Sequence, residues 1–239
     1  MASRLGVLMA IKMYDLAGAE VERRFSPFCW QIRMAVAHKG LELETIPWYL
    51  TDKATIAFSG QGRVPVIVDG NTTVVDSWKI VNYLESAYPN HPSLFGSDEA
   101  RGEAMFIKKW CENTLAPKIL PLVVLNVFQH LHPQDQAYFR KTREPRLGMT
   151  IEEFSAQPDS KLPQLHSILT PLQETLKQQS FLAGEKPNFS DYMVFSFFQW
   201  ARCVSPYKLL QPEHPVFAWR ERMLALYDGL AGKALGYDV

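Results

Sequence analysis

The amino-acid sequence predicts a small α/β unit followed by an all-helical domain. In roughly the first 90 residues, short runs rich in Val, Ile and Leu alternate with segments of helical period, as in a strand-and-helix unit. From residue 98 onward, every long segment has helical period. The stretch PNHPSLFGS at 89–97 has the composition of a linker. We therefore expect domains at 1–88 and 98–239, joined by a linker at 89–97.

The α/β unit is expected to run in the order β-α-β-α-β-β-α. Strands are predicted at 7–14, 41–48, 64–68 and 72–75, with Asp69-Gly70-Asn71 as the turn of a final hairpin. Helices are predicted at 27–39, 53–58 and 77–88, and Gly40 and Pro89 stop the first and the last. This order suits a small mixed sheet covered by helices.

The second domain is expected to contain only helices. They are predicted at 98–116, 117–131, 134–145, 160–178, 189–204 and 213–228, with a short helix at 150–156 inside a long loop. Pro117 and Pro121 are expected to kink or split the first long helical run.

The composition excludes several classes of partner. The 239 residues hold 25 basic and 25 acidic side chains and no basic run, so neither nucleic acid nor a membrane surface is an expected partner. The three cysteines, at 29, 111 and 203, are too few and too widely spaced for a disulfide framework or a metal site. The apolar stretches at 5–11 and 119–128 are too short for a secretion signal or a membrane span. We expect a soluble cytoplasmic protein with reduced thiols.

Three short segments carry the candidate chemistry. Ser26-Pro27 has the form of a helix start and follows the first predicted strand, where ligands of α/β units bind. Val64-Pro65 opens a strand, where a proline leaves backbone groups unpaired. Asp76-Ser77 starts the third helix with Ser77 as expected N-cap, and the amides beyond it form an anion site. Each segment alone also fits a purely structural role.

Together, the order and spacing of these segments resemble the glutathione transferase superfamily. The matching pieces are FSPFCWQIR at 25–33, RVPVIVDG at 63–70, DS at 76–77 and FLAGEKPNFSDY at 181–192, and the resemblance covers nearly the whole chain. It implies a thioredoxin-like domain followed by an all-helical domain, with Asn188 and Asp191 as a capping box in the last piece. The segment SPFCW at 26–30, which begins with a serine, is most similar to the serine-type, etherase-related class of fungi and bacteria. Cysteine classes differ from this chain at position 26.

The resemblance implies that Ser26 stabilises the thiolate of glutathione. A free thiol has a pKa near 8.5, and lowering it by about two units requires roughly 2.7 kcal/mol. A helix N-terminus supplies roughly 0.3–1 kcal/mol. A hydroxyl bound to a charged acceptor adds about 1.5–3 kcal/mol. Ser26 at an N-cap would offer both, acting as a donor while the sulfur of the co-substrate is the nucleophile.

The remaining contacts are also implied by the resemblance. The backbone at Val64-Pro65 would pair with the cysteinyl part of glutathione. Ser77 would hold the γ-glutamyl carboxylate and Asp76 the ammonium group. The glycine carboxylate needs a cation, with Lys53 as first candidate and Arg63 as second. The other substrate would lie between the domains, where the candidate aromatic residues are Trp30, Trp48, Tyr49, Trp110 and Phe128, although aromatic residues at helical spacing are commonly core.

Three functions remain open at this level. The first is an enzyme that conjugates glutathione to aromatic electrophiles or uses it to cleave aryl ethers. The second is a non-catalytic binder of hydrophobic aromatics, a ligandin. The third is a thiol transferase acting through Cys29, which stands three residues after Ser26, although with serine in the first position a two-thiol cycle cannot run. Cys29 is expected to be a small core residue. The resemblance also implies a homodimer, and the sequence does not name the electrophile.

Overall fold

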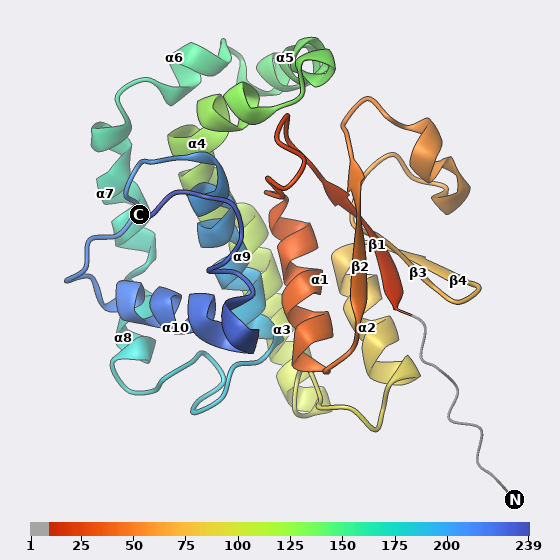
Figure 1. The fold of residues 1–239 in the computed structure, drawn as a ribbon. Coiled ribbons are helices and arrows are strands. Elements are labelled where there is room, and N and C mark those ends of the chain that lie inside the picture. The colour runs from red at the N-terminus through yellow and green to blue at the C-terminus, as the bar shows by residue number, and fades with distance from the viewer. Residues whose placement is uncertain (1–9) are drawn as a thin grey trace, which may run out of the picture.

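The structure is a computed structural model that describes residues 10–239. The first three positions of the strand expected at 7–14 lie outside the described residues. Figure 1 shows a small sheet flanked by helices on one side of the molecule and a larger group of helices on the other. This arrangement confirms the α/β domain followed by the all-helical domain.

The sheet has four strands in the order β2-β1-β3-β4. Strands β1 and β2 are parallel, and β3 is antiparallel to both β1 and β4. The bounds are β1 Ile11–Leu16, β2 Leu43–Trp48, β3 Val66–Asp69 and β4 Thr72–Val75. Strand β3 begins two residues later than expected because Pro65 cannot donate to the ladder. The peptide bond between Val64 and Pro65 is cis.

Two α-helices and a short 3₁₀ helix complete the first domain. They are α1 Pro27–His38, η1 Ala54–Ser59 and α2 Ser77–Ala87. The buried Lys39, just after α1, pairs with Glu85 of α2 at 2.8 Å and donates to the carbonyls of Tyr88 and Pro92, both at 3.2 Å. These bonds fasten the linker to the first domain, which explains how a segment of such irregular composition is held in place.

The helical domain follows the expected order, including the short helix near 150–156, with two differences. The helix expected at 160–178 is divided into two, and the helix that contains Pro121 is not split there. Its elements are α3 Asp98–Trp110, η2 Cys111–Leu115, α4 Ala116–His130, α5 Pro133–Leu147, α6 Ile151–Ser155, α7 Pro158–Ile168, α8 Thr170–Leu176, α9 Phe189–Val204 and α10 Pro215–Gly229. The break expected near Pro117 is the π-helical turn η2. Because proline has no N–H, it cannot bond to the carbonyl four residues back, which lies in that turn.

Helix α9 forms the centre of the core and is buried along almost its whole length. It packs against α1, where Gln31 Nε2 donates to Ser196 Oγ at 3.3 Å. The expected capping box at its start is confirmed, since Asn188 accepts from the helix and Asp191 accepts from the N–H of Asn188. Asp191 also accepts from Leu182 N at 2.8 Å and Trp219 Nε1 at 2.9 Å. One buried carboxylate therefore joins a loop and two helices.

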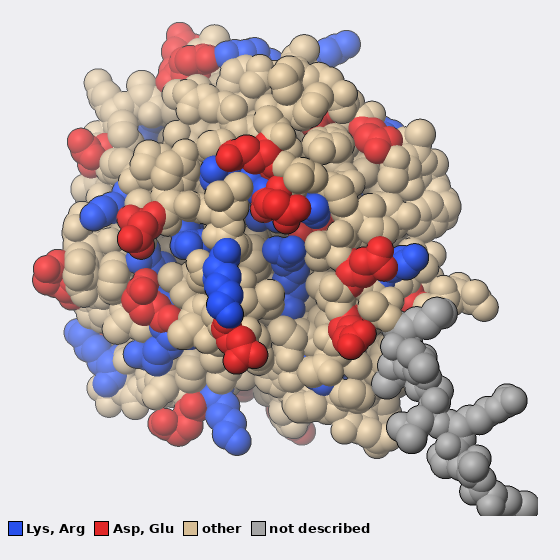
Figure 2. Space-filling model, viewed as in Figure 1, with Lys and Arg blue, Asp and Glu red and all other residues tan. Residues whose placement is uncertain are grey.

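The surface carries charges of both signs. Figure 2 shows basic and acidic side chains interspersed over the face viewed in Figure 1. Within residues 10–239, no helix combines the length and the apolar character that a membrane span requires.

The two domains are joined by a carboxylate at the start of α5. Asp135 is fully buried and accepts from Leu50 N at 2.8 Å, Thr51 N at 2.9 Å and Thr51 Oγ1 at 2.6 Å, just after β2. We expect Asp135→Ala to lower the free energy of unfolding by about 3 kcal/mol, because buried donors lose a charged acceptor. Urea denaturation measures this. The exposed Asp98→Ala is the control, and an equal loss in both variants would contradict the prediction.

Candidate functional site

Two neighbouring cavities meet at the N-terminus of α1, between the domains. One is apolar, with a volume of about 490 Å³, and the other is polar, with about 310 Å³. Both are lined by Ser26 and by residues on either side of it: Leu16, Phe28, Leu50, Arg143 and Arg146. A molecule in either cavity therefore lies beside the serine that the sequence singled out.

Ser26 is the N-cap of α1, as expected. Its Oγ accepts from Cys29 N at 3.3 Å, and its carbonyl accepts from Trp30 N at 3.0 Å. Pro27 has no N–H, so the free amide in the first turn is that of Phe28, which has no partner in the described chain. The site thus offers two donors at one point: the hydroxyl hydrogen of Ser26 and the N–H of Phe28. Both suit a developing negative charge at the helix N-terminus.

The polar cavity contains the predicted residues Trp48, Lys53, Arg63 and Val64. Lys53 Nζ donates to Gly62 O at 2.7 Å and lies 4.6 Å from the centre of the Trp48 ring, which fixes the cation at the cavity wall. Within residues 10–239, neither backbone group of Val64 has a hydrogen-bond partner. The cavity therefore combines an unpaired backbone segment with cations, which is suited to a peptide-like anion.

The start of α2 differs from the expected one only in the residue that caps it. The N-cap is Asp76, not Ser77; its backbone is left-handed, with a φ of 71°, and its Oδ1 accepts from Trp78 N at 3.1 Å and Lys79 N at 3.2 Å. Ser77 is the first helical residue and is nearly buried. In the part of the chain that the structure describes, its hydroxyl and amide have no partner, so both remain able to bind a carboxylate.

Four of the five predicted aromatic wall residues lie elsewhere. Trp30 is buried under the β1–α1 connection, where its Nε1 donates to Arg24 O at 2.7 Å. Tyr49 packs against His132, Phe128 against Phe139, and Trp110 against the core. None of these four lines either cavity, and Trp48 alone of the five does. Aromatic rings at helical spacing are largely core here, which is the alternative that the sequence left open.

The sequence prediction missed the residues that do form the apolar cavity. Its aromatic lining consists of Phe25, Phe28, Phe139, Phe197 and Trp200. Phe28 lies in the motif at 25–33, so its sequence position near Ser26 already indicated that it could line the site. Arg143 and Arg146 gave no such signal, because charged residues on a polar helix usually face solvent.

Cys29 lies in the first turn of α1 and is fully buried. Burial and the neighbouring Asp15 raise the pKa of its thiol well above the usual value. Burial also raises the pKa of Cys203 to about 12 and raises that of Cys111. Across residues 10–239, no group of three or more His, Cys, Asp and Glu side chains is placed to hold a metal ion.

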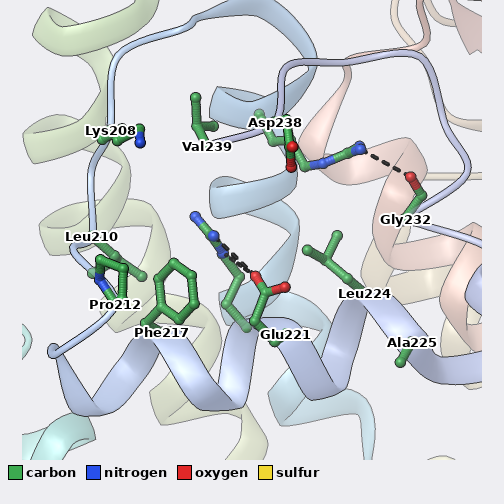
Figure 3. Close-up of a pocket in the computed structure, with 12 residues that line it drawn as sticks. Lys208, Leu210, Pro212, Phe217, Glu221, Leu224, Ala225, Gly232, Asp238 and Val239 are labelled. Carbon is green, nitrogen blue, oxygen red and sulfur yellow. Dashed lines mark hydrogen bonds and ion pairs between the residues drawn. The ribbon is translucent and has the colours of Figure 1, made fainter.

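A further cavity, of about 520 Å³, lies between α10 and the C-terminal segment (Figure 3). Among its lining residues, Arg220 pairs with Glu221 at 2.9 Å, and Arg202 donates to the carbonyl of Gly232 at 2.9 Å. None of the predicted site residues lines this cavity. The candidate site is therefore the pair of cavities at Ser26.

Comparison with known proteins agrees with this geometry. Residues 21–92 match the model for the glutathione S-transferase N-terminal domain, and residues 103–210 match the model for the C-terminal domain. The two matches fall on the two domains described above. The chain belongs to the glutathione transferase superfamily, with its thioredoxin-like first domain and helical second domain.

Solved structures share nearly the whole fold. Glutathione transferase GSTFuA3 from Phanerochaete chrysosporium is 28% identical, with a TM-score of 0.76 over 93% of both chains. A glutathione S-transferase of Ceriporiopsis subvermispora, solved in complex with glutathione, is 23% identical, with a TM-score of 0.77 over 93% of this chain and 99% of that one.

Similarity to curated relatives is either extended at low identity or local at higher identity. Glutathione S-transferase 4 from Zea mays is 24% identical over 224 residues, which are 90% of this chain and 88% of that protein. Glutathione S-transferase Z1 from Arabidopsis thaliana is 38% identical over 69 residues, which are 27% of this chain and 31% of that protein.

Proposed function

We propose that this protein is a glutathione transferase in which Ser26 stabilises the glutathione thiolate for attack on aromatic electrophiles. The observation that carries the proposal is the position of Ser26 at the junction of a polar and an apolar cavity. Glutathione would occupy the polar cavity, held there by the backbone of Val64 and by Lys53 or Arg63. Its γ-glutamyl end would extend beyond that cavity to Asp76 and Ser77, which line neither of the two cavities. The electrophile would occupy the apolar cavity.

The chemistry needs only groups already described. The thiol of glutathione loses its proton to solvent, and the thiolate accepts hydrogen bonds from Ser26 Oγ and Phe28 N. The sulfur then attacks an electron-poor carbon, a carbon–sulfur bond forms, and the leaving group departs with the bonding electron pair. Donors fixed before the reaction cost no reorganisation when the charge forms.

Within this function, we propose aryl-ether cleavage as in the etherase-related class, in which the leaving group is a phenolate. A substrate panel of aryl halides and aryl ethers tests this, with glutathione conjugates and free phenols measured separately. Conjugates from the halides with no phenol from any ether would contradict ether cleavage but retain the transferase. No product of either kind, together with tight displacement of a hydrophobic dye, would indicate the ligandin.

A thiol transferase acting through Cys29 is disfavoured by the burial of that thiol. We expect a thiol reagent at neutral pH to modify none of the three cysteines in the native protein and all three in denaturant, because each is buried with a raised pKa. Mass spectrometry after labelling counts the modified thiols. Rapid native labelling of Cys29 would restore the thiol-transferase hypothesis.

We also propose that the protein is cytoplasmic, as its widely spaced cysteines suggest, and that it is a homodimer, as the resemblance implies. Phe58 and Phe106 are the large apolar side chains most exposed in the described chain, at 55% and 72%. Exposed side chains of this kind favour a surface that a second subunit covers over a surface that faces solvent. We expect sedimentation velocity to give twice the chain mass, and Phe106→Asp to shift the protein toward the monomer. A wild-type protein that is monomeric at micromolar concentration would contradict this.

A further inference from the structure

We propose that the preferred electrophile carries an acidic group, such as a carboxylate or sulfonate on its aromatic ring, and that Arg143 and Arg146 of α5 bind this group. The inference rests on the proposed function, because it names the substrate class of that same site.

The charges that line the site are the first observation. The polar cavity has four cations: Lys53, Arg63, Arg143 and Arg146. Among the described residues that line it, none is acidic. The apolar cavity is lined by Arg143, Arg146 and one carboxylate, Glu112. Glu112 is already paired with Lys108 and with Lys109. Among the described residues that line the two cavities, no carboxylate therefore pairs with Arg143 or Arg146.

The surroundings of the two arginines are the second observation. Arg143 is half-buried and lies 5.1 Å from the Phe139 ring centre. Within residues 10–239, its one hydrogen-bond partner is the neutral Thr142 Oγ1, at 2.9 Å. Burial, and then repulsion from Arg146 and Arg63, lower the pKa of Arg143. Arg146 is exposed and has no ion-pair partner within residues 10–239. Like charges held together without an anion destabilise the empty site and favour a ligand that supplies one.

Another arginine of α5, Arg140, does have acidic partners nearby. Arg140, one turn earlier on α5, binds Glu144 at 2.7 Å and also pairs with Glu152 of α6. Glu144 and Glu152 thus form their ion pairs with Arg140. Arg143 and Arg146 instead face the cavities, and their charges remain available to a bound molecule.

Glutathione itself brings fewer negative charges than the site has cations. At this end of the site, glutathione would bring two negative charges, its glycine carboxylate and its thiolate. Lys53 and Arg63 line only the polar cavity, where the carboxylate would lie. Arg143 and Arg146 line both cavities, so they reach the space of the second substrate. Because their planar guanidinium groups bind carboxylates and sulfonates through paired donors, an acidic aromatic compound fits this position.

The test compares two matched electrophiles, chlorodinitrobenzene and its ring carboxylate, chlorodinitrobenzoate. In each reaction the glutathione sulfur bonds to the ring carbon, chloride leaves with the electron pair, and the thiol proton goes to solvent. The readout is the ratio of kcat/KM for the acid to kcat/KM for the neutral compound, each divided by its uncatalysed rate. Because both reactions use glutathione equally, effects on glutathione binding cancel in this ratio.

We expect the wild-type ratio to exceed ten and to fall as salt is added. Arg146→Gln and Arg143→Gln should each lower the ratio about tenfold, while Arg143→Lys should retain most of it. The control is Lys141→Gln, which removes the same charge from the same helix at an exposed position outside both cavities. A wild-type ratio near one, or equal ratios in the arginine variants and the control, would overturn the proposal.

A binding measurement separates this proposal from the proposed function. If neither compound is turned over, the transferase proposal fails. The anion-selective cavity is then tested by the affinities for two dyes, the anionic anilinonaphthalene sulfonate and the neutral Nile red. A selective loss of sulfonate affinity in Arg143→Gln and Arg146→Gln would still support an anion-selective cavity. Equal changes for both dyes would overturn it.

Discussion

Replacing Ser26 with alanine is expected to lower kcat for conjugation about ten- to a hundredfold. A hydroxyl bound to a charged acceptor contributes about 1.5–3 kcal/mol, and each tenfold in thiolate population corresponds to about 1.4 kcal/mol. The pH–rate profile should report the same change as a rise in the pKa of bound glutathione toward about 8.5, the value of a free thiol. Affinity for glutathione should change much less, because its other contacts remain.

The control for this substitution must reproduce the loss of a helix cap. Ser97→Ala removes the cap of α3, where Ser97 Oγ accepts from Ala100 N at 3.1 Å, far along the chain from both cavities. We expect similar stability losses from the two variants, about 1 kcal/mol each, but a rate loss only at Ser26. Ser26→Thr should recover part of the activity. Full activity in Ser26→Ala would show that another group stabilises the thiolate.

Replacing Asp191 with alanine is expected to have the largest effect on stability, a loss of about 4–5 kcal/mol. Its buried carboxylate accepts from the N–H groups of Leu182 and Asn188 and from the Trp219 indole, and the variant leaves all three donors without that acceptor. Such a loss is a large part of the 5–15 kcal/mol that is typical of folded domains. Urea unfolding measures it, with the slope of the transition unchanged.

The chain contains a matched control for this experiment. Thr150 and Glu153 form a second capping box at the start of α6, and Glu153 is exposed. Glu153→Ala should cost about 0.5–1 kcal/mol, because water replaces its contacts. Asp191→Asn should fall between the two, since its amide keeps one acceptor oxygen. Equal losses at positions 153 and 191 would show that burial of the carboxylate adds nothing.

The order of the secondary structure could be predicted from the sequence because its signals are local. Gly40 and Pro89 stop helices, and Asp69-Gly70-Asn71 makes a turn whatever surrounds it. The boundaries were less predictable where a neighbour decides them. Asp76, not Ser77, caps α2, with a φ of 71° that the residue type alone does not predict.

The site could be predicted only where it depends on one short segment. Ser26, Val64 and Lys53 line the cavities as expected, since each lies in or beside a segment that the sequence had marked. The apolar wall comes from six separate parts of the chain, among them those with Phe139 and Phe197, and no local pattern shows which aromatic residues of the helices meet there. Trp30 and Phe128 do not meet there, because Trp30 is buried and Phe128, which packs against Phe139, lines neither cavity.

The bonds from Asp135 to residues 50 and 51 have a consequence for protein engineering. They attach the helix that carries Arg143 and Arg146 to the end of the strand that carries Trp48. A chimera that exchanges the second domain at the linker would separate these partners, leaving two amides uncapped and α5 unanchored. Grafts intended to change substrate preference should therefore carry residues 50–51 together with α5, so that both walls of the cleft come from the same parent.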